Sequence, residues 1–322
     1  MAEQCRRLRD AKYSYDTEAD MTPWALVTPS SRGIGLALSR RLFRTTKLSL
    51  VATARGSLDE TREAILKKPS DEELKAAHGP RSAHGSGEDP QLEAMRQEGD
   101  ESRLTVLKLD VTDEGSIADA AGKCKDMFQG KGGEPSHLHL AFVLPGLLHP
   151  ERSPQQLELG KIEETFRVNT ISHLLFLKHF AAFLPRKSAK GLDDKTLFEG
   201  APRGHATWAT MSARVGSTSD NTLGGWYSYR ASKAAVNSLT RTFDRHLVAS
   251  AGEKAIALSL HPGTVKTGLS QEFWSNVKEE KLFEKEFVAR RLLDVVSGFG
   301  GKEGAERGRG RCWDWKGEEI KP

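Results

Sequence analysis

Short apolar runs alternate with longer amphipathic segments from Trp24 onward, and this alternation constrains the fold more than any other feature of the sequence. The runs are apolar at successive positions, which is typical of strands buried on both faces, and the segments between them repeat with the period of a helix. We predict strands at Trp24–Thr28, Leu48–Ala54, Leu104–Leu109, Leu138–Leu144, His205–Met211 and Ala255–His261. We predict helices at Gly33–Arg44, Ser57–Lys67, Glu114–Phe128, Lys161–Leu184, Trp226–Ser250 and Phe287–Ser297. Strands separated by helices form βαβ units, so the sequence predicts an α/β fold with a single Rossmann-type, doubly wound parallel sheet and helices on both faces.

The rest of the chain divides into an arm and two insertions. Residues 1–21 are polar and aperiodic, and we expect a mobile N-terminal arm before a single domain at 22–322. Polar segments rich in Gly and Pro interrupt the alternation at about 68–102 and 185–204. We expect both to be poorly ordered surface insertions.

Composition and charge exclude several classes of protein. The 48 basic and 44 acidic residues leave a net charge of only +4, so we expect no nucleic-acid partner. Arg307–Arg311 is either a small RNA-binding patch or, as we favour, a solvated loop between a helix and the last strand. The longest apolar stretch, Leu140–Leu148, is too short to cross a membrane. Cys5, Cys124 and Cys312 form no CxxC motif and no signal peptide is apparent, so we expect a cytoplasmic protein.

The segment from Thr28 to Gly35 lies where the first strand passes into the first helix, which is where a doubly wound sheet binds a dinucleotide. Glycine at 33 and 35 lets the backbone approach a pyrophosphate, whose charge the free N–H groups and the helix dipole would stabilise. The residues expected to contact the cofactor here are Thr28, Ser30, Ser31, Arg32, Gly33, Ile34 and Gly35.

Arg55 at the end of the second strand indicates which dinucleotide binds. An acidic residue there would repel a 2′-phosphate, whereas Arg55 can pair with one, and Arg32 adds a second cation. The sequence therefore favours NADP(H) over NAD(H). Asp110 and the following Val111 end the third strand and are placed to meet the adenine, although Asp110 could equally cap the next helix.

Tyr229 and Lys233 are four residues apart in a predicted helix and so share one face. A tyrosine must lower its pKa from about 10 to about 7 to act as an acid or base near neutrality. An ammonium about 4 Å away supplies roughly the required free energy at an effective dielectric of about 20. We therefore expect Lys233 to lower the pKa of Tyr229.

In this order, the glycine loop, Arg55, Asp110, Asn169, Ser212 and the pair Tyr229 and Lys233 resemble the short-chain dehydrogenase/reductase family over about residues 22–322. Tyr229-Arg-Ala-Ser-Lys-Ala-Ala and His261-Pro-Gly-Thr-Val-Lys-Thr carry the most specific resemblance. The segment Ser212-Ala-Arg-Val-Gly-Ser and the ending Trp313-Asp-Trp-Lys-Gly are similar to the C-factor and sniffer-type carbonyl reductase branch.

The resemblance implies a role for each matching residue. Tyr229 would donate the proton, Lys233 would lower its pKa and bind the nicotinamide ribose, and Asn169 would hold a proton-relay water. The residues implied to border the nicotinamide are Pro262, Gly263, Val265 and Thr267. The resemblance also implies a homo-oligomer assembled through the helices at Lys161–Leu184 and Trp226–Ser250.

Three positions depart from the family pattern. Pro29 replaces the first loop glycine and removes an N–H group, which would weaken phosphate binding. Val143-Leu-Pro-Gly146 stands where the family usually has Asn-Asn-Ala-Gly. Ala213 takes the place of one serine of the usual doublet, so we choose Ser212 as the catalytic serine and Ser217 as the second choice.

Two functions remain in view from the sequence. The first is an NADP(H)-dependent oxidoreductase acting on a small-molecule carbonyl or alcohol. The alternative is a cofactor-binding regulatory or signalling protein with little or no catalysis. We expect no metal, because His137 and His139 share a strand face without a third ligand. Trp226 and Tyr227 either cover a substrate or cap their helix. Ser270–Glu284 is either a lid or a surface helix.

Overall fold

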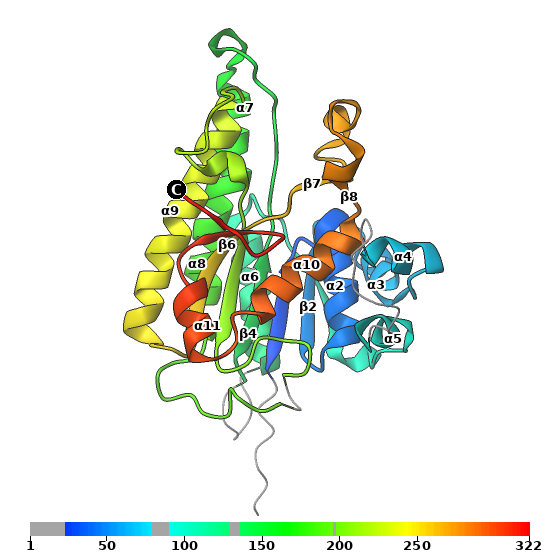
Figure 1. Cartoon of the computed structure of the whole chain (residues 1–322). Helices are drawn as coiled ribbons and strands as arrows, with labels where there is room; N and C mark the ends of the chain where they lie inside the picture. Colours follow the sequence, from blue (N-terminus) through cyan, green and yellow to red (C-terminus); the bar gives the residue numbers. More distant parts are fainter. Residues whose placement is uncertain (1–22, 79–89, 129–135, 196–197) are drawn as a thin grey trace, which may run out of the picture.

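The computed structural model describes residues 23–78, 90–128, 136–195 and 198–322, and its centre is one eight-stranded sheet (Figure 1). The strand order is β10-β9-β6-β5-β4-β1-β2-β3, and a separate pair joins β7 to β8. The strands are β1 (Trp24–Thr28), β2 (Ser49–Ala54), β3 (Leu104–Lys108), β4 (Leu138–Val143), β5 (Ala206–Met211), β6 (Ala255–His261), β7 (Thr264–Val265), β8 (Leu282–Phe283), β9 (Cys312–Asp314) and β10 (Glu319–Ile320). Neighbouring strands are parallel except β10, which is antiparallel to β9. The predicted doubly wound fold is confirmed, and the order reverses between β1 and β4, where such sheets bind ligands.

Helices cover both faces of this sheet (Figure 1). They are α2 (Gly33–Thr45), α3 (Leu58–Leu66), α4 (Asp71–His78), α5 (Pro90–Arg96), α6 (Glu114–Phe128), α7 (Leu159–Phe166), α8 (Ser172–Phe180), α9 (Tyr227–Ser250), α10 (Lys285–Ser297) and α11 (Gly301–Gly308). Side chains of α2, α3, α10 and α11 fill the core on one face, and those of α6, α8 and α9 fill the core on the other. Within the described ranges, no helix is both long and apolar enough to cross a membrane.

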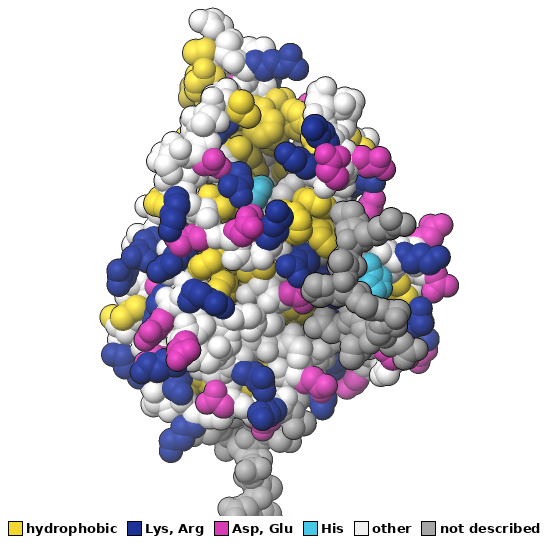
Figure 2. Space-filling model, viewed as in Figure 1, with side chains coloured by type: hydrophobic (Ala, Val, Ile, Leu, Met, Phe, Trp, Pro, Cys, Tyr) yellow, Lys and Arg dark blue, Asp and Glu magenta, His cyan; other side chains and the backbone are white. Residues whose placement is uncertain are grey.

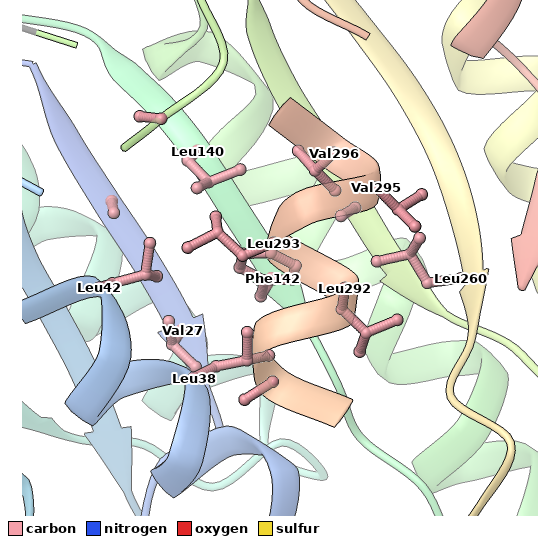
Figure 3. Packing of buried hydrophobic residues seen from close by; sticks show 14 of the residues in the cluster. Val27, Leu38, Leu42, Leu140, Phe142, Leu260, Leu292, Leu293, Val295 and Val296 are labelled. Carbon is pink, nitrogen blue, oxygen red and sulfur yellow. The ribbon is translucent and has the colours of Figure 1, made fainter. Parts of the chain in front are cut away.

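Strand β1 shows why the strands read as continuous apolar runs. Ala25 and Val27 belong to one core, whereas Trp24 and Leu26 belong to the other, and all four are fully buried. Figure 3 shows the first core, where Leu293 of α10 lies against the sheet beside the labelled side chains of β1, β4 and α2. Burial of each large apolar side chain stabilises the fold by about 1.5–3 kcal/mol. The cores on both faces of the sheet therefore fix the position of its strands.

The predicted single helix at Lys161–Leu184 is wrong in detail. The structure has α7, a π-helical turn at Arg167–Ile171, and then α8. The π turn contains Asn169, whose side-chain amide donates to the Leu147 carbonyl and accepts from the Leu147 N–H. Widened turns of this kind are frequent at functional sites, and this one places a residue of the predicted site.

The prediction of poor order in the two insertions is wrong for the parts that the structure describes. The first insertion contains α4 and α5, and Leu74 of α4 is buried. In the second, Leu192 and Phe198 are buried in the core, and the Phe198 ring stacks on His139 at 4.0 Å between centroids. Residues 79–89 and 196–197, and the predicted arm at 1–21, lie outside the described residues.

The Arg-Gly segment is also more ordered than a solvated loop. Arg307 lies in the last turn of α11, and the Arg309 guanidinium is 3.2 Å from the buried carboxylate of Asp244 on α9. The N–H of Gly310 donates to the carbonyl of Ala257 in β6. The Arg309 side chain is therefore paired within the fold and is not available to bind RNA.

His137 and His139 form a buried hydrogen-bonded chain at the amino end of β4. His139 Nε2 lies 2.6 Å from the Pro202 carbonyl and must donate to it, so His139 Nδ1 accepts from His137 Nε2 at 3.1 Å. Both rings are neutral in this arrangement. Burial lowers the pKa of His137 to about 4 and that of His139 to about 3.

We expect acid to destabilise the protein through this pair. Because the folded pKa values lie below the unfolded value of about 6.5, the unfolded chain binds more protons as the pH falls below 6.5. Each histidine should cost about 2 kcal/mol between pH 7.5 and pH 5. Urea denaturation at both pH values measures the loss, and His137→Phe should lose less stability than the parent. An identical pH dependence in the two proteins would contradict this account.

Candidate active site

The glycine loop between β1 and α2 is held by buried hydroxyl groups. Thr53 Oγ1 donates to Thr28 Oγ1 at 2.7 Å, and Ser30 Oγ, which is also buried, donates to the Val27 carbonyl. Of the predicted contact residues, Thr28 and Ser30 therefore point into the protein, while Ser31 and Arg32 are exposed at the edge of the sheet. A Cβ atom at Gly35 would lie 1.9 Å from the Pro29 carbonyl oxygen, so this position requires glycine.

The amino end of α2 is open to an anion. Arg32 precedes the helix without a side-chain cap, and the first turn holds no acidic residue. Gly33 has φ +59°, and its missing Cβ would face the Thr267 methyl group at 3.5 Å, so the loops after β1 and β6 meet here. Free N–H groups at a helix start suit a phosphate, and the residues present therefore fit a dinucleotide diphosphate.

Arg55 and Asp110 follow the carboxyl ends of the neighbouring strands β2 and β3. Arg55 is exposed, and its charge contributes to lowering the pKa of Asp110. The larger cause is that Asp110 Oδ1 accepts from the Thr112 hydroxyl at 2.7 Å and the Thr112 N–H at 2.9 Å. Asp110 thus holds the turn that leads into α6, whereas Asp113, whose Oδ1 accepts from the Gly115 N–H at 2.9 Å, caps the helix itself.

The segment Val143–Gly146 braces the sheet without the asparagines that the family pattern usually places there. The Leu144 N–H donates to the Thr28 carbonyl at 2.7 Å, and its side chain lies 3.4 Å from where a Gly35 Cβ would be. Backbone bonding and packing therefore join β4 to the glycine loop.

Tyr229 and Lys233 lie together in the first turns of α9, both buried. Lys233 Nζ is 5.8 Å from the centroid of the Tyr229 ring and donates to the Met211 carbonyl at 2.9 Å and the Pro145 carbonyl at 3.5 Å. These carbonyls end β5 and follow β4, so the pair is centred on the carboxyl edge of the sheet.

The expected lowering of the Tyr229 pKa is wrong for the chain by itself. Burial raises the pKa of Tyr229 to about 12 and lowers the pKa of Lys233 to about 7. Both groups lose water when α9 packs on the sheet, and this desolvation is the cause of both pKa shifts. The nearby His173, itself buried, also stays neutral, because burial and then the Lys233 charge lower its pKa to about 3.

Ser212 and Ser217 occupy different surroundings. Ser212 is buried against α9, where its hydroxyl donates to the Lys233 carbonyl at 3.3 Å. The Ser217 hydroxyl instead accepts from the Asp220 N–H within its own loop. The structure thus brings Ser212 to the Tyr229 and Lys233 helix. Asn169 also reaches this helix, because its Nδ2 donates to Ser232 Oγ at 3.0 Å.

Aromatic rings hold the segment after β6. Gly263 has φ +76°, and a Cβ there would lie 2.9 Å from the Phe283 ring and 3.1 Å from Trp315. Val265 in β7 pairs with Phe283 in β8. The segment Ser270–Glu284, expected to be a lid or a surface helix, contains a 3-10 turn at Gln271–Asn276 and then β8.

Glu151 was missed by sequence reasoning. It is only 2% exposed, and its carboxylate accepts from both the N–H and the hydroxyl of Ser228, next to Tyr229. Glu151 lies in a polar stretch that carries no motif, and its partner is 77 residues away. No local signal in the sequence could have joined them.

Comparison with known proteins agrees with this geometry. No protein-family model matches the chain. Over 77 residues it is 46% identical to 1-hydroxy-2-glutathionyl-2-methyl-3-butene dehydrogenase of Rhodococcus sp. (strain AD45), a match to 24% of this chain and 30% of that protein. Over 112 residues it is 30% identical to C-signal of Myxococcus xanthus, covering 35% of this chain and 58% of that protein. Both matches span less than two thirds of the relatives' own length.

Solved structures match over nearly the whole chain. The NADPH-bound carbonyl reductase from chicken fatty liver is 23% identical with a TM-score of 0.67, over 94% of this chain and 99% of that chain. The carbonyl reductase Sniffer of D. melanogaster is 20% identical with a TM-score of 0.64, over 94% and 100%. The fold is therefore that of the short-chain dehydrogenase/reductases. The resemblance that the motifs indicated is confirmed.

Proposed function

We propose that the protein is an NADP(H)-dependent oxidoreductase of the short-chain dehydrogenase/reductase type that interconverts a small-molecule carbonyl compound and its alcohol. The observation that carries the proposal is the position of Tyr229 and Lys233. They lie side by side at the carboxyl edge of the sheet, with Ser212 against the same helix and an anion-ready helix start nearby. The NADPH-bound carbonyl reductase with the same fold supports the cofactor.

The cofactor would lie along the carboxyl edge. Bound there, NADP(H) would supply or accept the hydride. The first N–H groups of α2 would bind its diphosphate, and Arg32 and Arg55 would pair with its 2′-phosphate. Asp110 and Val111 would adjoin the adenine. The segment after β6 would border the nicotinamide through Pro262, Gly263, Val265 and Thr267.

Tyr229 would move the proton to or from the substrate oxygen, which the Ser212 hydroxyl would orient. With a pKa of about 12 in the buried site, the Tyr229 hydroxyl holds its proton at neutral pH and is ready to donate it during carbonyl reduction. Lys233 would bind the ribose and stabilise the tyrosinate left after proton transfer. Asn169 would hold the loop after β4 through Leu147.

Turnover tests this function directly. Purified protein should oxidise NADPH in the presence of some member of a panel of aldehydes, ketones and quinones. Tight NADPH binding with no turnover across the panel would instead favour a cofactor-binding regulatory protein, as the altered Pro29 and Val143–Gly146 segments allow.

Arg55 should set the choice of cofactor. A charge-assisted contact to the 2′-phosphate contributes about 1.5–3 kcal/mol, which corresponds to a roughly ten- to hundredfold preference for NADPH over NADH. Pro29 adjoins the shared diphosphate and should weaken both cofactors alike. Titration by tryptophan quenching measures both affinities, and Arg55→Asp should remove the preference. An unchanged ratio in the variant would show that Arg55 does not face the phosphate.

The proposal extends to the location of the protein in the cell and to its assembly. The described cysteines, Cys124 and Cys312, are free and buried, as in a protein of the reducing cytoplasm. Ile171 and Leu174 are 44% and 45% exposed on one side of the π turn and α8. Exposed apolar side chains there support a homo-oligomer, which sedimentation would detect.

A further inference from the structure

Trp226 has the most unusual backbone in the site. Its φ of 52° and ψ of 46° lie in the left-handed region, and no other non-glycine residue in the described ranges has a positive φ. Gly224 and Gly225 before it have φ of 65° and 67°. A bulky residue in this conformation is a genuine outlier, and such outliers persist where the surroundings impose them, commonly at functional sites.

Glu151 imposes this conformation from both sides. Its carbonyl oxygen accepts from the Trp226 N–H at 2.6 Å, and its carboxylate accepts from the N–H of Ser228 at 3.1 Å and from the Ser228 hydroxyl. Glu151 and Ser228 are 2% and 4% exposed, so these bonds are shielded from water. Trp226 gives α9 no side-chain cap, and the distant carboxylate takes that place.

The strained backbone sets the Trp226 ring beside the acid/base residue. The ring is half-buried, with its centroid 6.2 Å from that of Tyr229 in an edge arrangement and 5.1 Å from that of Phe273. Phe273 belongs to the 3-10 turn Gln271–Asn276, which lies between β7 and β8 in the chain. Figure 2 shows hydrophobic side chains gathered between the segment that joins β7 to β8 and the upper ends of α7 and α9 in this view.

We propose that the Trp226–Phe273 pair is the specificity-determining wall of the site and selects carbonyl compounds with an aromatic group attached to the reacting carbon. Glu151 is the positioning residue that fixes the wall. The inference rests on the proposed function. Trp226 lies edge-on to Tyr229 and tilted against Phe273, and both rings stay partly exposed. An aromatic group of the substrate packed on their exposed faces would be attracted to them beyond simple burial.

Two aldehydes with the same number of carbon atoms test the wall. The ratio of kcat/KM for benzaldehyde to kcat/KM for heptanal should fall about three- to tenfold in Trp226→Asn, which loses the ring. Asparagine tolerates the left-handed conformation, so Trp226→Asn should add no backbone strain that would lower the melting temperature. Trp226→Phe should keep most of the ratio. Leu223→Asn is the matched control, because Leu223 in the same loop is 91% exposed, and its ratio should not change.

Glu151 has its own pair of variants. Glu151→Ala should lower the benzaldehyde to heptanal ratio as Trp226→Asn does, with the NADPH dissociation constant unchanged. Glu151→Gln keeps an acceptor for the Ser228 N–H and should restore the ratio in large part. A purely structural role for Glu151 would lower both rates equally, leave the ratio unchanged and overturn the positioning role.

Binding separates this inference from the proposed function. Failure of the parent to turn over any member of the aldehyde, ketone and quinone panel would contradict the proposed function, and calorimetric titration of acetophenone into the NADPH-saturated protein would still test the wall. Weaker binding by three- to tenfold in Trp226→Asn supports the wall. Equal dissociation constants in the parent and Trp226→Asn would overturn it.

Discussion

Tyr229→Phe should lower kcat for carbonyl reduction by about 10²–10⁴-fold, the contribution of a positioned acid in proton transfer. The variant loses the hydroxyl that would donate to the substrate oxygen. It keeps the ring that packs beside Trp226, so the fold and the wall of the site should survive. The affinity for NADPH should change little, because the proposed diphosphate and 2′-phosphate contacts lie on α2 and at Arg55.

Initial rates of NADPH oxidation measure the effect, and Tyr227→Phe is its matched control. Tyr227 lies two residues earlier on α9 and is 40% exposed, so the same chemical change there should leave kcat within about twofold. A Tyr229→Phe variant as active as the parent would remove Tyr229 from the chemistry. The proton would then have to come from another group.

The sequence predicts the sheet well because its signals are local. Buried strands read as apolar runs, and the helix after each strand begins near a loop of recognisable composition. Glu114–Phe128 and Ala255–His261 have the predicted bounds. The order of β1 and β4 and the shared edge of Gly33 and Tyr229 then follow from the rules of doubly wound sheets.

Helix α11 was not predicted, because it depends on tertiary packing. The helix α11 contains Gly304 and Gly308, which argue against a helix by local propensity. A Cβ at Gly304 would lie 2.4 Å from the Phe299 carbonyl oxygen, and one at Gly308 would lie 2.7 Å from the Phe299 ring. Both glycines are there because Phe299 packs against the helix, and no window of sequence around them records that contact.

The site shows the same division between local and distant causes. The four-residue spacing places Tyr229 and Lys233 on one face, as predicted. The direction of their pKa shifts depends on how completely β4, β5 and α9 exclude water from the two side chains. The four-residue spacing in the sequence contains no information about that burial. The hydrogen bonds from Ser228 on α9 to the Glu151 carboxylate likewise join residues that are 77 positions apart in the sequence.

Lys233→Met should separate activity from stability. At an effective dielectric of about 20, a charge 5.8 Å from the ring centroid contributes about 3 kcal/mol to stabilising a tyrosinate, so its loss should lower kcat roughly a hundredfold. The folded protein should not suffer in the same way. Methionine has a similar length and fills the buried space without an amine to desolvate.

The pH dependence of stability identifies the cause. The folded pKa of Lys233, about 7, lies below its ordinary value of 10.5, so between these values the unfolded chain binds the extra proton and stability rises with pH. From pH 7 to pH 10 this group should add about 3 kcal/mol to the free energy of unfolding of the parent. Lys233→Met should lack that increase, whereas Lys123→Met, at an exposed position on α6, should keep it. Urea denaturation of the three proteins at both pH values makes the comparison. Equal increases in all three would mean that Lys233 keeps its proton throughout, held by the Met211 and Pro145 carbonyls, and that the ammonium is available to Tyr229 over the whole range.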